Sequence, residues 1–342
     1  MRELAAIILA AGKGTRMKSD RAKVTFPIAD KPMVQRVVDT ALALKCSLIP
    51  VVVGFKKETV ISCLEDNDRL TFVEQKEQLG TGHAVQMAQE SLQDFEGDVL
   101  ILCGDVPLLS VDTVRMLHEK HVSSGAAATV LTAVLDDAGK YGRMLRDEKG
   151  NICGIVEYKD ATEEQRKIGE FNTGIYCFDK ALLFAALSRI SNRNEQQEYY
   201  LTDTLGILYN EGHKISNVIL EDLMEVSGVN SQEQLAYLED VYVDKIRKKW
   251  LNQGVMMHNP STIYIGDDVV IEPDVEIGQG CVLKGKSTIS EGVELGPNCY
   301  IQHAVISEHS ILMGHNVVID SYINEREILD FAVKVIDEED YD

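Results

Sequence analysis

Two glycines and a row of basic residues follow the first apolar segment of the chain. Gly12 and Gly14 lie just after the apolar run 4–11, and glycines at this spacing let the backbone approach a phosphate chain and present its amide N–H groups. One acid, Asp20, opposes five cations within eleven residues, namely Lys13, Arg16, Lys18, Arg21 and Lys23. In a chain of net charge −21, this local reversal favours a phosphate site over a plain glycine turn or a solvated charged face.

An acidic residue stands at the end of another mainly apolar segment. Gly104 and Asp105 directly follow residues 98–103. Because ligands of a parallel sheet bind beyond the carboxyl ends of its strands, we expect Asp105 in that crevice, where its oxygens suit Mg²⁺. A carboxylate that caps a turn before Pro107 is the alternative interpretation.

A third segment, residues 74–83, contains two glutamines and two glycines between a predicted strand and a predicted helix. Side-chain amides there could match the donor and acceptor edge of a nucleotide base. A simple turn at the start of a helix would also explain this composition.

The elements that must hold these residues alternate along the first two thirds of the chain. Strands are expected at residues 5–10, 48–53, 71–73 and 98–103, and helices at 33–44, 59–64, 83–92 and 111–122. Strands that alternate with helices and are apolar on both faces predict an α/β fold with a Rossmann-like, mostly parallel sheet. The crevice beyond the carboxyl ends of its strands is the expected binding site.

The pattern changes after residue 230. Residues 232–251 carry apolar side chains at helical spacing and predict a connecting helix. Beyond them, apolar residues recur every six positions at Ile265, Ile271, Ile277, Leu283, Ile289, Leu295 and Ile301. This repeat predicts a parallel β-helix of about three coils over residues 263–320, with its register slipping by one at Ile306. The predicted domains are a sheet domain at 1–230, a linker helix at 231–254, a hexapeptide-repeat β-helix at 255–325 and an acidic tail at 326–342.

Composition excludes several classes of protein. The 342 residues include 34 Lys and Arg against 55 Asp and Glu, which argues against binding nucleic acid or an anionic membrane. The apolar run 4–11 is far shorter than the roughly 20 residues of a membrane span, and Gly12 follows it instead of a cleavage site. Seven cysteines without metal or disulfide spacing predict a reduced, cytoplasmic protein.

Eight segments, in this order, resemble the nucleotidyltransferases that activate sugar 1-phosphates. The likeness is greatest to the uridyltransferase half of the bacterial N-acetylglucosamine-1-phosphate uridyltransferase family. It rests on residues 12–23, 75–83, 104–108, 141–143, 157–161, 172–174, 198–203 and 228–230. The resemblance implies a nucleotide-diphospho-sugar transferase sheet, or pyrophosphorylase domain, followed by a short left-handed β-helix.

The resemblance also implies roles for matching positions. Its catalytic cations would be Arg16 and Lys23, and its Mg²⁺ ligands would be Asp105 and Asn230. UTP would be bound by Ala11, Gly12, Gly14, Gln75, Gln78, Gly80 and Thr81. The sugar phosphate would be bound by Gly142, Glu157 and Asn172.

The implied reaction is attack of N-acetylglucosamine 1-phosphate on the α-phosphorus of UTP, without a covalent intermediate. The products are UDP-N-acetylglucosamine and pyrophosphate. The nucleophile is already anionic at neutral pH, so the site needs positive charge more than a general base. The resemblance further implies a homo-oligomer, a trimer through the β-helix, and no acetyltransferase activity, because the acetyl-CoA site of longer family members has no counterpart.

Four positions depart from the family's pattern. Ala22 replaces a proline, Cys103 a tyrosine, Tyr158 a histidine and Gln197 a glycine. Cys103 bears most on the expected sugar, because the missing phenol would leave a looser pocket. Two alternatives therefore stay open: a nucleotidyltransferase for another nucleoside triphosphate and hexose 1-phosphate, and a non-catalytic regulatory scaffold of the same fold. The presence of Arg16, Lys23, Asp105 and Asn230 together argues against the scaffold.

Overall fold

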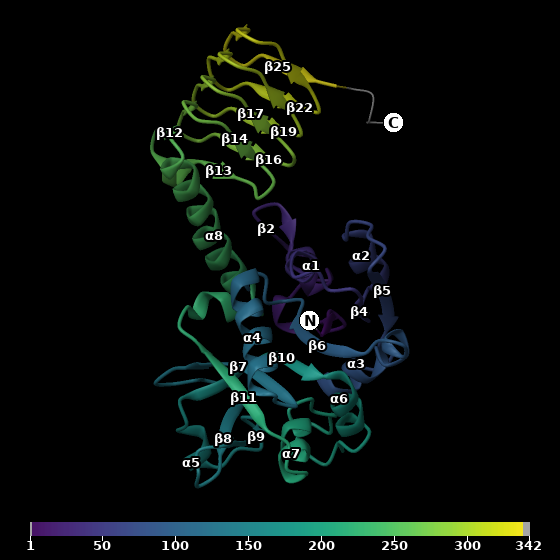
Figure 1. The fold of residues 1–342 in the computed structure, drawn as a ribbon. Coiled ribbons are helices and arrows are strands. Elements are labelled where there is room, and N and C mark those ends of the chain that lie inside the picture. Colours follow the sequence, from purple (N-terminus) through teal and green to yellow (C-terminus); the bar gives the residue numbers. More distant parts are fainter. Residues whose placement is uncertain (1, 338–342) are drawn as a thin grey trace. The chain divides into compact units, whose positions relative to one another are not determined.

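The computed structural model describes residues 2–337, which form two compact units (Figure 1). The first contains the residues up to Phe26 and Pro32–Gln232, and the second contains Pro27–Lys31 with the residues from Glu233 onward. The short segment Pro27–Lys31 thus belongs to the C-terminal unit, whereas the sequence pattern alone places it inside a sheet domain at 1–230.

The first unit is built on a mixed sheet with the order β11-β7-β10-β6-β1-β4-β5. At its centre β1 (Glu3–Leu9) pairs in parallel with β4 (Ile49–Val53) and β6 (Gly97–Cys103). The other strands are β5 (Leu70–Glu74), β7 (Ala128–Val134), β8 (Arg143–Arg146), β9 (Ile152–Val156), β10 (Glu170–Asp179) and β11 (Ile215–Leu220). The expected mostly parallel α/β sheet is confirmed, with β10 running antiparallel between β6 and β7.

Alternate residues of the central strands face two separate cores, as the period of a strand requires. Ile7 and Ile101 pack with α3, α6 and α7, whereas Ile8 and Leu100 pack with α1, α2 and α4. The helices are α1 (Met33–Ala43), α2 (Lys57–Ser62), α3 (Thr81–Met87), α4 (Val111–Ser124), α5 (Glu163–Arg166), α6 (Lys180–Leu187) and α7 (Asp203–Asn210). Short 3-10 turns include η1 (Thr15–Met17), η2 (Lys23–Thr25), η3 (Glu90–Leu92) and η4 (Leu223–Val226).

Three loops leave this sheet at the same edge. Strands β1, β4, β5 and β6 are mutually parallel, so their carboxyl ends lie together. The glycine loop follows β1, the glutamine loop follows β5, and Asp105 follows β6. The sheet edge at which the strand pattern predicts a binding site is therefore the edge where these loops follow the strands.

The second unit begins with α8 (Gln232–Asn252) and continues as a parallel β-helix. Its first sheet contains β12 (Met256–Met257), β15 (Glu276–Ile277), β18 (Glu294–Leu295), β21 (Ile311–Leu312) and β24 (Ile328–Leu329). Its second contains β13 (Tyr264–Ile265), β16 (Val282–Lys284), β19 (Tyr300–Gln302), β22 (Val317–Ile319) and β25 (Lys334–Ile336). Its third contains β14 (Val270–Ile271), β17 (Thr288–Ile289), β20 (Val305–Ile306) and β23 (Tyr322–Ile323). A 3-10 turn, η5 (Pro260–Thr262), lies between β12 and β13, and strands β2 (Pro27–Ile28) and β3 (Lys31–Pro32) pair as a hairpin.

The β-helix is longer than the sequence pattern predicts. Within the described residues it has four full coils and two strands of a fifth, not about three coils that end near residue 325. Strands β24 and β25 pair with β21 and β22, so the first part of the expected acidic tail at 326–342 belongs to the β-helix. The end of that tail, residues 338–342, lies outside the described residues.

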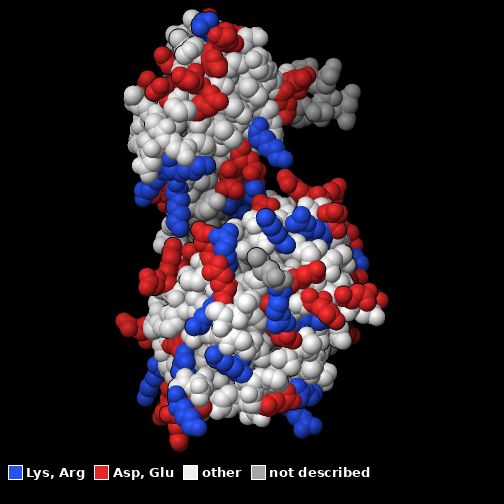
Figure 2. All heavy atoms as spheres, in the orientation of Figure 1, with Lys and Arg blue, Asp and Glu red and all other residues white. Residues whose placement is uncertain are grey.

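Acidic and basic side chains are both scattered over the visible surface of the two units, among more numerous residues of other kinds (Figure 2). None of the helices in residues 2–337 is both long and apolar enough to cross a membrane.

Candidate active site

The residues expected to act on phosphate and metal form one cluster. The Lys23 ammonium pairs with Asp105 Oδ2 and lies 3.1 Å from Asn230 Oδ1. Arg16 Nη2 donates to the same Asn230 oxygen at 2.7 Å. These four residues come from three distant parts of the sequence, yet their polar atoms share one site. Two of them, Lys23 and Asp105, are largely shielded from solvent, with side-chain exposures of 12% and 25%.

Backbone contacts of the surrounding loops fix this cluster. Gly14 has a left-handed backbone with φ 62°, and a Cβ atom there would lie 2.6 Å from the Lys23 Cβ, so only glycine lets the loop pass Lys23. Gly104 N–H donates to the Leu9 carbonyl at 3.0 Å, which ties the end of β6 to the end of β1. Val229 N–H donates to the Asp105 carbonyl at 3.0 Å and brings Asn230 beside Asp105.

The glutamine loop lies against the glycine loop. Gln78 Nε2 donates to the Ala11 carbonyl at 2.7 Å. Buried Gln75 donates to the Gly80 carbonyl at 3.1 Å and lies 3.1 Å from His83 Nδ1. A Cβ atom on Gly80, whose φ is 110°, would lie 2.7 Å from the Tyr199 carbonyl oxygen. The two segments predicted to bind UTP are thus adjacent, and the glycine is required by a close backbone approach.

The three predicted sugar residues also converge. Asn172 N–H donates to the Gly142 carbonyl at 2.9 Å, and a Cβ on Gly142 would lie 3.3 Å from Glu157 Oε2. The pairing of β10 with β7 shifts register just after Asn172, and such irregularities re-aim side chains near binding sites. The structure therefore brings Gly142, Glu157 and Asn172 together.

Burial raises the pKa of the Glu157 carboxyl, and the hydrogen bond from Thr202 at 3.2 Å offsets only part of that rise. The charges of Asp160, Asp203 and Glu198 raise it further. A half-buried carboxyl of this kind suits a hydrogen bond with a sugar hydroxyl.

Tyr141 packs beside strand β10 and is influenced by the charges of Asp105 and Arg16. Its ring packs on Phe171, with ring centres 4.6 Å apart. Burial and the charge of Asp105 raise the pKa of its phenol, whereas Arg16 lowers it. Arg143, only 1% exposed, donates to the Tyr141, Ala138 and Gly139 carbonyls and fixes this turn. Sequence reasoning assigned no role to Tyr141 or Thr202, although both lie in motifs that it singled out.

Cys103, which replaces a tyrosine of the family's pattern, lies at the end of β6. Its Sγ is 3.5 Å from the Gly174 carbonyl oxygen, beside the irregular part of β10. Burial and the charge of Asp105 raise the pKa of the thiol to about 12, so it is neutral at physiological pH. A neutral thiol thus lies beside Gly174 of β10 and within the influence of the Asp105 charge.

The cluster has the chemistry of a cation site. A carboxylate oxygen and an amide oxygen, from Asp105 and Asn230, face one ammonium group, and hard divalent cations select such oxygen donors. In residues 2–337 no group of three or more His, Cys, Asp and Glu side chains could hold a metal ion. The donor set fits Mg²⁺ only if water and phosphate oxygens complete its coordination, which is usual for this ion.

Residues 5–255 match the family model described as Nucleotidyl transferase. With a parallel sheet and a phosphate-type loop at its edge, the chain belongs to the nucleotidyl transferase family and is a nucleotidyltransferase. Within that family it is similar to proteins named "Bifunctional protein GlmU". It is 43% identical over 330 residues to that of Geobacillus sp. (strain WCH70), 43% over 325 residues to that of Heliobacterium modesticaldum and 44% over 337 residues to that of Caldanaerobacter subterraneus subsp. tengcongensis. The alignments cover 94%, 95% and 95% of this chain and 72%, 70% and 72% of those relatives.

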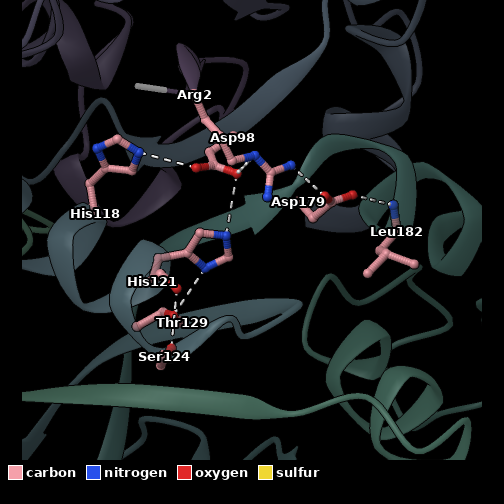
Figure 3. A network of polar contacts seen from close by, with 8 residues as sticks. All are labelled: Arg2, Asp98, His118, His121, Ser124, Thr129, Asp179 and Leu182. Atoms are coloured by element: carbon pink, nitrogen blue, oxygen red, sulfur yellow. Dashed lines mark hydrogen bonds and ion pairs between the residues drawn. The ribbon is translucent and has the colours of Figure 1, made fainter.

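A second titratable cluster lies at the opposite end of β6 (Figure 3). Fully buried Asp98 lies 3.2 Å from His118 Nε2, 3.2 Å from Arg2 Nε and 3.5 Å from His121 Nε2. Arg2 also pairs with Asp179 at 2.5 Å, and His121 Nδ1 lies 3.0 Å from Thr129 Oγ1. These contacts join strands β6, β7 and β10 to α4, and the network has a structural role.

Proposed function

We propose that the protein is a uridylyltransferase that converts UTP and N-acetylglucosamine 1-phosphate to UDP-N-acetylglucosamine and pyrophosphate. The observation that carries this proposal is the convergence of Arg16, Lys23, Asp105 and Asn230 on shared polar atoms. A site with two cations and two oxygen donors suits a reaction between two phosphates. Similarity to GlmU proteins over 94% of the chain supports the same reaction.

The reaction is an in-line displacement. A phosphate oxygen of the sugar phosphate forms a bond to the α-phosphorus of UTP, and the bond from that phosphorus to the bridging oxygen of the β-phosphate breaks. Pyrophosphate leaves with the electron pair, and no protein group forms a covalent bond. The nucleophile needs no general base because it is already ionised.

The chain's own residues position the reactants and lower their repulsion. The amide groups of Ala11, Gly12 and Gly14 and the cations Arg16 and Lys23 hold the triphosphate. Gln75, Gln78, Gly80 and Thr81 recognise uracil through amide and backbone groups, and Gly142, Glu157 and Asn172 receive the sugar. Asp105 and Asn230 would hold Mg²⁺, which when bound neutralises charge that develops on the phosphate oxygens.

The test measures pyrophosphate release with four nucleoside triphosphates and a panel of sugar 1-phosphates in the presence of Mg²⁺. UTP with N-acetylglucosamine 1-phosphate should give the highest kcat/KM. If glucose 1-phosphate is preferred by tenfold, about 1.4 kcal/mol in transition-state stabilisation, the sugar assignment is wrong. If a different triphosphate is preferred, the uridylyl assignment is wrong, and if no pair releases pyrophosphate the protein is a scaffold.

We also propose that the protein forms a homo-oligomer, a trimer, through the β-helix. The sheet of β14, β17, β20 and β23 places one residue of each strand in an outward row, namely Val270, Thr288, Val305 and Tyr322. Val270 and Tyr322 are 50% and 59% exposed. A row of exposed apolar side chains on a regular surface is typical of a protein interface.

A further inference from the structure

The hairpin Pro27–Lys31 has a strained turn. Ala29 and Asp30, at its tip, have left-handed backbones with φ 47° and φ 70°. A tight hairpin turn needs positive φ at both central positions, which glycine and asparagine adopt most easily. For Ala29, which has a Cβ atom, this conformation is sterically unfavourable. Such strain persists only where surrounding contacts hold it in place.

Contacts within the second unit do hold it. Ala29 is fully buried in the core formed by α8 and the first β-helix coils. Its N–H donates to Glu239 Oε1 at 3.3 Å, and its carbonyl accepts from Asp267 N–H at 3.0 Å. Ala29 in the strained turn is therefore packed in the core, and both its N–H and its carbonyl group are hydrogen-bonded.

The Asp30 side chain adds charged contacts. Its Oδ1 accepts from the Tyr264 hydroxyl at 3.1 Å and lies 2.9 Å from Lys284 Nζ. The Tyr264 hydroxyl also lies 3.2 Å from Glu239 Oε1. A Cβ on Gly266 would lie 2.6 Å from Asp30 Oδ2. Glycine at this position of the β-helix therefore leaves room for the Asp30 carboxylate. We call Asp30, Glu239, Tyr264 and Lys284 the hairpin clamp.

The clamp joins two segments that lead directly to the cluster of the candidate active site. Lys23 precedes the hairpin by only four residues, and Asn230 precedes Glu233, where the second unit resumes, by three. Met33 N–H donates to the Phe26 carbonyl at 3.0 Å and closes the base of the hairpin. Lys23 and Asn230 themselves lie 3.1 Å apart. Lys23 and Asn230 are thus each only a few residues away from a segment that the clamp holds in place.

We propose that the hairpin clamp is a positioning device, which keeps the Lys23 ammonium and the Asn230 amide in contact by anchoring the two segments that carry them. This inference rests on the proposed function for its kinetic consequence. Because a small misplacement of a catalytic group can lower the rate by up to about 100-fold, loosening the clamp lowers kcat. Lys23 is only one of the groups proposed to hold UTP, and the uracil residues are not attached to the clamp, so the KM for UTP changes less than kcat.

The test compares Tyr264→Phe with Tyr300→Phe in the full chain. Tyr300 occupies the same position two coils along the same sheet, and its hydroxyl bonds Gln302 Oε1 at 2.5 Å instead of the hairpin. Asp30→Asn is the second clamp variant, because asparagine tolerates the left-handed turn. Each protein is assayed for kcat and KM. Each is also labelled under native conditions with an amine-reactive reagent, and modification of Lys23 relative to Lys214 is quantified by peptide mass spectrometry.

We expect both clamp variants to lower kcat by about tenfold with the KM for UTP within twofold. We also expect the Lys23 to Lys214 labelling ratio to rise at least threefold, while Tyr300→Phe leaves all three quantities unchanged. A merely structural role would raise labelling of both lysines together, because partial unfolding exposes both. An unchanged ratio in both clamp variants would overturn the inference. If wild-type protein releases no pyrophosphate, the proposed function fails, and the labelling ratio still decides the clamp.

Discussion

At the scale of single residues, the site depends on a lysine that lies between two expected metal ligands. The sequence identified Lys23, Asp105 and Asn230 because each follows a strand end or completes a family motif. It could not show that the ammonium of Lys23 contacts both oxygen donors, because these contacts span 82 and 207 positions of the chain.

Removing either oxygen donor should stop most turnover. We expect Asp105→Ala and Asn230→Ala each to lower kcat by about 100-fold or more, since loss of one transition-state contact in such sites costs 10²–10³. Steady-state pyrophosphate release at saturating UTP and Mg²⁺ measures the effect, with circular dichroism as a check on folding. Near-normal turnover of either folded variant contradicts the assignment of these residues.

The Asp98 network predicts an acid-dependent loss of stability. Burial raises the pKa of Asp98, but its contacts with His118, His121 and Arg2 lower it more, so the folded pKa lies well below the ordinary value. The folded protein then binds fewer protons than the unfolded one, and the stabilisation is present above about pH 4 and lost as pH falls. Urea unfolding of wild type and Asp98→Asn at pH 5 and pH 3 should show a smaller difference at pH 3. A difference that does not shrink would mean that Asp98 is not held ionised.

At the scale of elements, the six-residue apolar repeat predicts the first coils of the β-helix but not its last strands. The repeat has a five-residue step at Ile301 to Ile306 and again at Val318 to Ile323, because the turns at His303 and Asp320 are tight. After the second step the periodic signal is too short to recognise. The sequence therefore predicts an acidic tail from residue 326, where the structure has the last two described strands, β24 and β25.

A buried asparagine holds two of these later coils together. Asn316 is fully buried, donates to the Asp330 carbonyl at 2.7 Å and accepts from Gly314 N–H at 3.0 Å. Asn316→Ala leaves these groups without partners and should lower the free energy of unfolding by about 1–3 kcal/mol. The single tryptophan, Trp250, is buried in the second unit, so its fluorescence during urea unfolding reports this loss. Exposed Asn324→Ala is the control, expected within about 0.5 kcal/mol of wild type, and equal effects of the two changes would contradict the role of Asn316.

At the scale of the whole molecule, the two compact units do not follow the order of the chain. A hairpin from the N-terminal quarter of the sequence belongs to the unit of the β-helix. Nothing in the polarity of residues 27–31 indicates this, because the contacts that hold them come from residues more than two hundred positions away. Sequence reasoning therefore predicted the domain types but not that residues 27–31 belong to the second unit.

The exposed row on the β-helix predicts self-association. Tyr322→Lys places a charge at the most exposed member of the row and should convert the oligomer to smaller species. Light scattering during size-exclusion chromatography measures the molar mass. Tyr237→Lys is the matched control, because Tyr237 is 60% exposed on α8 and outside the row. If Tyr322→Lys keeps the wild-type mass, the row is not the interface.

One comparison tests most directly whether positive charge at the edge of the sheet brings two phosphates together. Lys23→Ala and Lys214→Ala are assayed for release of pyrophosphate from UTP and N-acetylglucosamine 1-phosphate with Mg²⁺. Lys214 lies just before β11, and its ammonium donates to the Ser124 carbonyl at 3.0 Å. Lys214→Ala is therefore the matched control, because it makes the same substitution outside the cluster. We predict that Lys23→Ala lowers kcat/KM by about 100-fold or more and that Lys214→Ala stays within twofold of wild type. A folded Lys23→Ala variant within threefold of wild type would contradict the account.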